Sequence, residues 1–335
     1  MTIKIAHVGS YFEKENDIVK QMLRSLETFS ELNVLEHDLR IYSKTWFIRY
    51  RRGPHGTLII RRYFFNQIIK SKPDLMILNA GKQILTNKQF DKLNRAGIKS
   101  LAVGLSDPDL MAIGLQIAKN CNYYFTNSST ALSYYHNNGQ ENCYLLKFAT
   151  ESIGSPPTNK EKLFDVVVVG GMRTDRIPIV NTLTDAGFSV GCFGRSWSAD
   201  LVPRATISES VRGADYVNAI RSGSIYLSFA GTVAGYENIK IGLLDAAAQG
   251  ACVITRDFVD VANFFEKESE ILTYVEGKDI VKLISETLDS SNKVLSLGSR
   301  AQQRVLRDHL WPHRWVLVFK ILGISLGKDG TCDDK

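Results

Sequence analysis

Two carboxylates eight residues apart, Glu237 and Asp245, stand in the segment YENIKIGLLDAAAQGACVIT (residues 236–255). Glu237 lies in the approach to a helix of small residues, and Asp245 lies within that helix, directly before three alanines. A carboxylate among small apolar residues needs a polar partner. The two adjacent hydroxyl groups of a ribose are a suitable partner, because a carboxylate can accept a hydrogen bond from each. An acid at a helix N-terminus is also a common cap or dipole partner, and Glu237 is open to that interpretation.

A second candidate site lies in the turn VVVVGGMRTDR. Gly170 and Gly171 would let a ligand approach the backbone closely, while Arg173 and Arg176 offer charge and hydrogen bonds for phosphates. A plain tight turn with surface arginines would show the same spacing. A nicotinamide dehydrogenase would need G-x-G-x-x-G here and an acid about 20 residues later. The next strand ends in FGRSW instead, which argues against a dehydrogenase.

These motifs need a scaffold to position them, and the hydrophobic pattern predicts strands that alternate with helices. We expect strands at residues 3–9, 32–39, 72–80, 99–107, 122–127, 142–149, 164–171, 189–194, 225–230 and 251–255. We expect helices at residues 17–29, 89–98, 177–188, 214–224 and 243–250. Continuous apolar strands in this alternation predict parallel sheets covered by helices on both faces.

The chain of 335 residues is too long for one compact core. The polar stretch TESIGSPPTNKEK (150–162), with a glycine and two consecutive prolines, is the best candidate for a linker. The fold class predicted is therefore α/β with two Rossmann-like domains, at residues 1–153 and 160–308. A last helical segment at 309–327 follows them.

The first domain also offers polar residues where strands end. His7, Gly9 and Ser10 lie at the end of the first strand, and Asp107 follows the strand at 99–107. In doubly wound sheets ligands bind at such strand ends, so these residues are candidates for contact with a second substrate, with Asp107 as a general base. The alternatives are a core histidine at His7 and a turn-forming aspartate before Pro108.

The composition is that of a soluble globular protein, with 44% hydrophobic and 23% charged residues. The start MTIKIAHVGS lacks a basic leader with a long apolar run, and no stretch is long and apolar enough for a membrane helix. The five cysteines are scattered without CxxC spacing, which favours buried thiols in a reducing compartment. We therefore expect a cytoplasmic protein.

A basic stretch at residues 40–72 contains nine Lys and Arg residues and no acid, interleaved with aromatic residues. Such a stretch could contact a membrane surface, an anionic acceptor or nucleic acid. The plainer interpretation is a helix with a solvated basic face. We expect peripheral membrane association at most, and no nucleic acid partner.

The second half resembles glycosyltransferases of the GT-B fold, and among them the CgeB-like branch with a "glycosyl transferases group 1" C-terminal domain. Retaining members carry an E-x7-E signature, which Glu237-x7-Asp245 matches with Asp in the second place. The helix of small residues that ends at Gly250 before a strand also fits the family, as do VVVVGGMRTDR, GRSW, FFEKESEILTYVEGKDIVKLI and DHLWPHRW. The resemblance covers residues 160–315 and is weaker over 1–155.

The resemblance implies two sheets that face across a cleft, with the last helix crossing back to the first domain. It assigns Asp245 to the nucleotide ribose and Glu237 to the donor sugar or the reacting centre. The full donor-binding set comprises Gly170, Gly171, Arg173, Arg176, Gly194, Arg195, Tyr236, Asn238, Lys240 and Asp245. The catalytic candidates are Glu237, Asp107 and His7, and the acceptor-side candidates are Gly9 and Ser10.

The implied activity is transfer of a hexosyl group from a nucleotide sugar, with a UDP-sugar as the expected donor, to an unidentified carbohydrate or small-molecule acceptor. The signature favours retention of configuration, and inversion with Asp107 as the base remains open as an alternative. The resemblance implies no metal and no cofactor, because the nucleotide sugar is a co-substrate. A nucleotide-sugar epimerase or hydrolase of the same fold, and a nucleotide-sugar-binding protein without catalysis, remain open as alternatives.

Overall fold

The computed structural model describes residues 2–9, 17–39, 54–79, 85–151, 162–275, 280–324 and 326. These residues divide into two compact units. Unit 1 comprises the described residues up to Lys147 and those from Trp311 onward, and unit 2 runs from Phe148 to Leu310. The chain therefore leaves unit 1 between Lys147 and Phe148 and re-enters it between Leu310 and Trp311.

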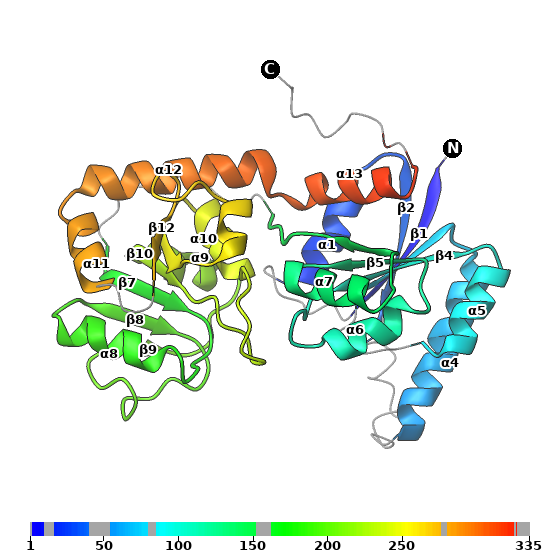
Figure 1. Ribbon diagram of the computed structural model, residues 1–335, viewed down its shortest axis with the longest axis horizontal. Coiled ribbons are helices and arrows are strands. Elements are labelled where there is room, and N and C mark those ends of the chain that lie inside the picture. Colours follow the sequence, from blue (N-terminus) through cyan, green and yellow to red (C-terminus); the bar gives the residue numbers. More distant parts are fainter. Residues whose placement is uncertain are drawn as a thin grey trace. The chain divides into compact units, whose positions relative to one another are not determined.

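Unit 1 is built on a six-stranded sheet in the order β2-β1-β3-β4-β5-β6, in which all neighbouring strands are parallel. Its strands are β1 (Ile3–Gly9), β2 (Leu32–Asp38), β3 (Leu75–Asn79), β4 (Lys99–Gly104), β5 (Tyr123–Thr126) and β6 (Cys143–Leu145). Its helices are α1 (Ile18–Leu26), α4 (Pro54–Ser71), α5 (Asn87–Arg95), α6 (Met111–Ala118), α7 (Ser129–Asn137) and α13 (Trp311–Ile321) (Figure 1).

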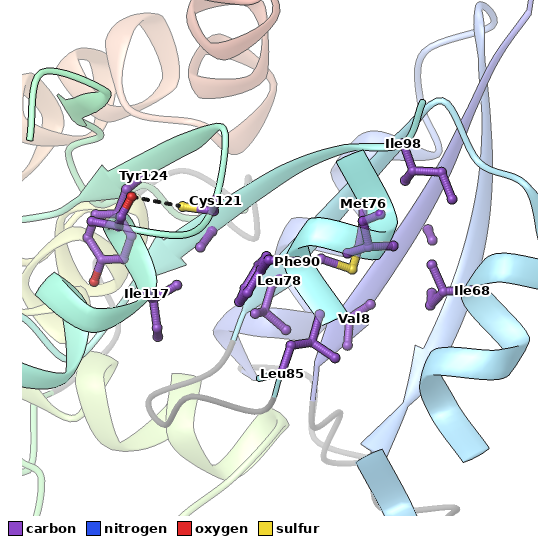
Figure 2. Close-up of a cluster of buried hydrophobic side chains, with 14 of the residues drawn as sticks. Val8, Ile68, Met76, Leu78, Leu85, Phe90, Ile98, Ile117, Cys121 and Tyr124 are labelled. Carbon is purple, nitrogen blue, oxygen red and sulfur yellow. Dashed lines mark hydrogen bonds between the residues drawn. The ribbon is translucent and has the colours of Figure 1, made fainter. Parts of the chain in front are cut away.

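The core of unit 1 explains why its strands are apolar without interruption. Val8 of β1 and Met76 of β3 pack with Ile68 of α4 and Phe90 of α5 on one face of the sheet (Figure 2). Ile77, which points to the opposite face, is also fully buried. Both faces of the sheet are therefore covered, as the continuous apolar strands predict.

Helix α13 belongs to unit 1, where it packs on α1 through two buried tryptophans. The Trp311 indole donates to Gln21 Oε1 at 3.2 Å, and the Trp315 indole donates to Ser25 Oγ at 2.7 Å. Both polar N–H groups are thus satisfied while the rings fill the core. Pro312 stands in the first turn of α13, where its missing N–H leaves no helical bond unmade.

Unit 2 repeats the plan with a second parallel sheet, in the order β12-β11-β10-β7-β8-β9. Its strands are β7 (Phe164–Val169), β8 (Val190–Phe193), β9 (Thr206–Ser208), β10 (Gly223–Ser228), β11 (Cys252–Arg256) and β12 (Leu272–Tyr274). Its helices are α8 (Ile177–Asp185), α9 (Ala214–Arg221), α10 (Ile241–Ala248), the 3-10 helix η1 (Val259–Asn263), α11 (Ile280–Leu288) and α12 (Ser291–Asp308) (Figure 1).

The core of unit 2 follows from the same alternation. Val166 and Val168 of β7 pack with Leu183 of α8 and Ile284 of α11, and all four are at most 1% exposed. Val167, between the two valines, is fully buried on the other face. The prediction of two Rossmann-like α/β domains is confirmed.

The basic stretch at 40–72 lies partly outside the described residues, which resume at α4. Within that helix Arg62 and Tyr63 are exposed, whereas Phe64 is fully buried. Membrane contact through this stretch remains a prediction. Among the described helices, none combines the length and the hydropathy that a membrane crossing requires.

Candidate functional site

The glycine turn that follows β7, at Gly170 and Gly171, is held by the side chain of Arg176. Gly170 has φ +150°, a backbone conformation that residues with a side chain rarely adopt. A Cβ atom on Gly170 would lie 2.9 Å from a terminal nitrogen of Arg176. The Arg176 guanidinium donates to Gly171 O at 2.8 Å and lies 5.1 Å from the centre of the Phe229 ring. Arg176 therefore supports the turn, and its burial lowers its pKa.

The residues that follow β8 hold the same turn through hydrogen bonds. The Trp197 indole donates to Gly170 O at 2.8 Å, and Met172 N donates to Arg195 O at 2.8 Å. Gly194 is packed so closely that a Cβ atom there would lie 2.2 Å from Gly170 O. Residues 194–197 (GRSW) thus pack against the glycine turn and hydrogen-bond to it, while the Arg195 side chain is exposed.

The loop that joins β10 to α10 folds back on itself as a narrow hairpin. Thr232 N donates to Tyr236 O at 2.7 Å, and Asn238 N donates to Ala230 O at 3.0 Å. An antiparallel bridge pairs Gly231 with Glu237. The hairpin carries Glu237 at the carboxyl edge of the sheet, directly before α10 begins.

Arg173 joins the glycine turn to this hairpin. Its guanidinium donates to Thr232 O at 2.8 Å and pairs with Asp175 Oδ1 at 3.2 Å. Gly231 leaves the space that Asp175 occupies, because a Cβ atom there would lie 2.6 Å from Asp175 Oδ2. The structure therefore brings together the two motifs that the sequence analysis treated separately.

Glu237 is partly exposed beside a pocket. Its Oε1 lies 3.1 Å from Arg256 Nε, at the end of β11, and its side chain is 36% exposed. The pocket has a volume of about 360 Å³, and its lining includes Asp175, Ile179, Phe229, Gly231, Arg256 and Tyr274. An apolar pocket with a few polar groups at its edge is typical of small-molecule sites.

The other predicted residues of the hairpin differ in their exposure. Tyr236 is 37% exposed, whereas Asn238 is 3% exposed. Lys240 is the N-cap residue of α10 in an extended conformation. The Tyr236 side chain is therefore more accessible than that of Asn238, and the roles of all three residues stay predictions.

Asp245 is buried, and hydroxyl groups occupy both of its oxygens. Thr150 Oγ1 donates to Asp245 Oδ1 at 2.5 Å, and Tyr216 OH donates to Asp245 Oδ2 at 2.9 Å. The residue is 2% exposed, and burial raises the pKa of the carboxyl to about 6 despite the two hydrogen bonds. The carboxylate is buried and each of its oxygens already accepts a hydroxyl, so the ribose assignment stays a prediction.

The raised pKa of Asp245 makes stability depend on pH. Because the pKa is about 6 in the folded protein and 3.8 ordinarily, the folded state binds the extra proton between these values. The free energy of unfolding should therefore fall by about 3 kcal/mol as the pH rises from about 4 to about 6 and beyond. Urea unfolding of the wild type and Asp245→Asn from pH 4 to 8 tests this. The decrease in unfolding free energy should disappear in the variant. The same dependence on pH in both proteins would contradict a raised pKa of Asp245.

The candidates in unit 1 are buried rather than presented to solvent. His7 is fully buried beside the Asn79 side chain, and burial lowers its pKa to about 3, so its ring is neutral. Asp107 is 6% exposed and accepts from Tyr135 OH at 2.8 Å and from Tyr124 OH at 3.3 Å. Burial raises the pKa of the Asp107 carboxyl.

The acceptor-side candidates Gly9 and Ser10 differ in what can be said of them. Gly9 ends β1 in register with Asn79 of β3, and it is buried. Ser10 lies outside the described residues. In the part of the chain that the structure describes, no group of three or more His, Cys, Asp and Glu side chains could hold a metal ion.

Four residues of these networks were not predicted from the sequence. Asp175 stands within the quoted glycine turn, and Arg256 directly follows the quoted strand ACVIT, so their positions after strands could have identified them. Thr150 and Tyr216 carry no such signal. They meet Asp245 only through the fold, from 95 and 29 residues away along the chain.

Comparison with known proteins identifies this architecture. Residues 173–319 match the model of the glycosyl transferase-like family. No curated protein matches the sequence. HepE of Anabaena, in complex with UDP and glucose, is similar with a TM-score of 0.67 at 13% identity, over 96% of this chain and 99% of that chain.

Two other solved structures extend the comparison. Sucrose-phosphate synthase of Thermosynechococcus elongatus has a TM-score of 0.67 at 14% identity, over 96% of this chain and 98% of that chain. TarM of S. aureus has a TM-score of 0.59 at 12% identity, over 79% of this chain and only 57% of that longer chain. The chain thus has the GT-B fold, and its segment 173–319 matches the glycosyl transferase-like family.

Proposed function

We propose that the protein transfers a hexosyl group from a UDP-sugar to a carbohydrate or small-molecule acceptor. The observation that carries this proposal is the hydrogen bond from Arg173 to Thr232 O, which joins the glycine turn to the hairpin of Glu237. The turn has the residues that suit a diphosphate, and the hairpin has an acid that suits a sugar. A structure similar to this chain, HepE of Anabaena, was solved in complex with UDP-glucose, which supports this donor class.

The donor would bind at the carboxyl edge of the second sheet, where a doubly wound fold binds its ligands. In this proposal Arg173 contacts the diphosphate, with Arg176 holding the turn behind it and Lys240 contributing charge from the start of α10. The diphosphate can approach the backbone closely because Gly170, Gly171 and Gly194 have no side chains. Arg195, Tyr236 and Asn238 complete the edge on either side.

The reaction breaks the bond between the anomeric carbon and the diphosphate and forms a bond to an acceptor oxygen. Negative charge develops on the leaving diphosphate, and fixed guanidinium groups stabilise it. Positive charge develops at the anomeric carbon, where the Glu237 carboxylate would stabilise it. The E-x7-D spacing favours retention of configuration. Asp107 and His7, with Gly9 and Ser10, remain predictions for the acceptor side.

A thermal-shift series tests the donor class. UDP and UDP-glucose should raise the melting temperature, whereas GDP-mannose and dTDP-glucose should raise it less. Isothermal titration with UDP then gives the affinity. The absence of any binding of UDP, GDP or dTDP sugars would contradict the proposal.

Arg173 is expected to matter for UDP binding in a way that another ion-paired arginine does not. Replacement of Arg173 by alanine removes a charge-assisted contact to phosphate and should weaken UDP binding about tenfold. Arg204→Ala is the matched control, because Arg204 pairs with Asp185 on the exposed surface at 2.6 Å and 65% side-chain exposure. Titration should show a change of less than about twofold for the control. Equal losses of UDP affinity in the two variants would contradict the assignment of Arg173 to the diphosphate.

Donor turnover separates transfer from the alternatives. UDP release that requires a sugar acceptor supports a transferase. Release from UDP-glucose without any acceptor would indicate a hydrolase or epimerase instead. Tight UDP-glucose binding without release would indicate a binding protein.

A further inference from the structure

Asp245 stands at a junction of three segments of unit 2 that are far apart in the sequence. It lies on α10, Tyr216 lies on α9, and Thr150 lies just after the chain enters the unit. Each of the two hydroxyls takes one oxygen of the carboxylate. The carboxylate therefore has the partners that a ribose diol would otherwise provide.

Thr150 is itself anchored to the segment by which the chain leaves unit 2. Its N–H donates to His309 O at 3.0 Å, and a parallel bridge pairs it with Leu310. The His309 ring nitrogen in turn lies 2.7 Å from Phe264 O. The entry and exit segments of unit 2 are thus joined to each other, and Asp245 joins both to α10.

The start of α10 lies close to the same tyrosine hydroxyl. A Cβ atom on Gly242 would lie 2.7 Å from Tyr226 OH and 3.5 Å from Tyr216 OH, so both hydroxyls lie against the first turn of the helix. The last hydrogen bond of the hairpin is that of Asn238 N, and Lys240, two residues later, is the N-cap of the helix. Whatever fixes the first turns of α10 therefore fixes one end of the hairpin.

We infer that Asp245 is a positioning residue rather than a ribose ligand: it ties Thr150 and Tyr216 to α10 and so holds the hairpin of Glu237 in place for the donor. The inference rests on the proposed function for the identity of the donor. It assigns the two acids of the E-x7-D pattern to different tasks. Glu237 faces the ligand, and Asp245 holds the helix that follows.

Positioning of α10 and binding of a ribose differ in whether an amide can replace the carboxylate of Asp245. An asparagine at 245 can accept from one hydroxyl with its oxygen and donate to the other with its amide, because Thr and Tyr hydroxyls both donate and accept. Asp245→Asn should therefore preserve the positioning role. A ribose contact that needs two acceptors would be impaired by the same change.

The first experiment measures the affinities of UDP and 2′-deoxy-UDP for five proteins by titration: wild type, Asp245→Asn, Thr150→Val, Tyr216→Phe and Tyr226→Phe. Thr150→Val and Tyr216→Phe keep the acid but remove one tie, and should weaken both ligands equally, by about tenfold. Tyr226→Phe is the matched control, because the Tyr226 hydroxyl also lies against the first turn of α10 but donates to Val169 O at 3.5 Å, whereas that of Tyr216 donates to Asp245. It and Asp245→Asn should remain within about threefold of wild type.

The opposite pattern overturns the inference. If Asp245 binds the ribose, Asp245→Asn will lose affinity for UDP and lose the preference for UDP over 2′-deoxy-UDP. Thr150→Val and Tyr216→Phe will then have no effect on either ligand.

A second measurement needs no nucleotide and separates this inference from the proposed function. Hydrogen exchange of the hairpin amides of Thr232, Tyr236 and Asn238 should be faster in Thr150→Val and Tyr216→Phe than in Tyr226→Phe and Asp245→Asn. Unchanged exchange in all four variants overturns the inference. Failure of the wild type to bind UDP or UDP-glucose overturns the proposed function, and the exchange rates then decide the role of Asp245 alone.

Discussion

Replacement of Glu237 by glutamine should lower the rate of UDP release from UDP-glucose by about 10²- to 10³-fold while UDP affinity changes little. The expectation follows from charge: glutamine has the size of glutamate but cannot stabilise positive charge at the anomeric carbon. UDP lacks the sugar, so its binding does not depend on that carboxylate. The loss should therefore appear in kcat, as it does when an interaction acts only in the transition state.

The control for this prediction is another exposed glutamate of unit 2. Glu286 pairs with Lys282 on α11 at 3.7 Å and is 57% exposed. Glu286→Gln should leave kcat and the affinity for UDP unchanged. A Glu237→Gln protein with wild-type kcat would remove Glu237 from the chemistry and leave it as the partner of Arg256.

Gly194→Ala should lower the stability of unit 2. The added Cβ atom would lie 2.2 Å from the oxygen and 2.4 Å from the carbon of Gly170, which are backbone atoms that no side-chain rotation can move away. Either β8 or the glycine turn must shift. Overpacking of this kind typically costs about 1–3 kcal/mol of unfolding free energy.

Gly171→Ala is the matched control, because it adds the same methyl group to the same turn. A Cβ atom on Gly171 would lie 3.5 Å from Arg195 O, which is an ordinary contact. Calorimetry should therefore show a large loss of melting temperature for Gly194→Ala and a small one for Gly171→Ala. Equal melting temperatures for the two variants would show that the turn yields freely.

Ten of the described strands were predictable because their buried residues form apolar runs, whereas the short strands β9 and β12 were not predicted. Residues 166–169 are four consecutive valines, and β7 is buried on both faces at residues 166–168 as a result. Helices that a glycine ends were also predictable, as at Gly97 and Gly187, which have φ +74° and +94°. Helices α6 and α7 were not predicted, because their apolar residues show only a weak helical periodicity and no strong boundary signal stands beside α6.

The site was predictable as two motifs but not as one arrangement. Spacing identified Arg173 and Glu237, because each follows a strand. It could not show that Arg173 reaches Thr232, since that contact spans 59 residues and depends on β10 lying beside β7. Nor could it show the burial of Asp245. A carboxylate that binds a ligand and one that binds Thr150 occupy the same place in the E-x7-D pattern.

The chain leaves unit 1 after Lys147 and re-enters it at Trp311, and this affects the order in which the two units can fold during synthesis. Unit 2 is an insertion in the sequence of unit 1, whose α1 needs Trp311 and Trp315 to cover it. The ribosome releases every described residue of unit 2 before those tryptophans, so the nascent chain can complete the later unit first. We expect α1 to remain uncovered during that interval, which reverses the usual N-terminal-first order of domain folding.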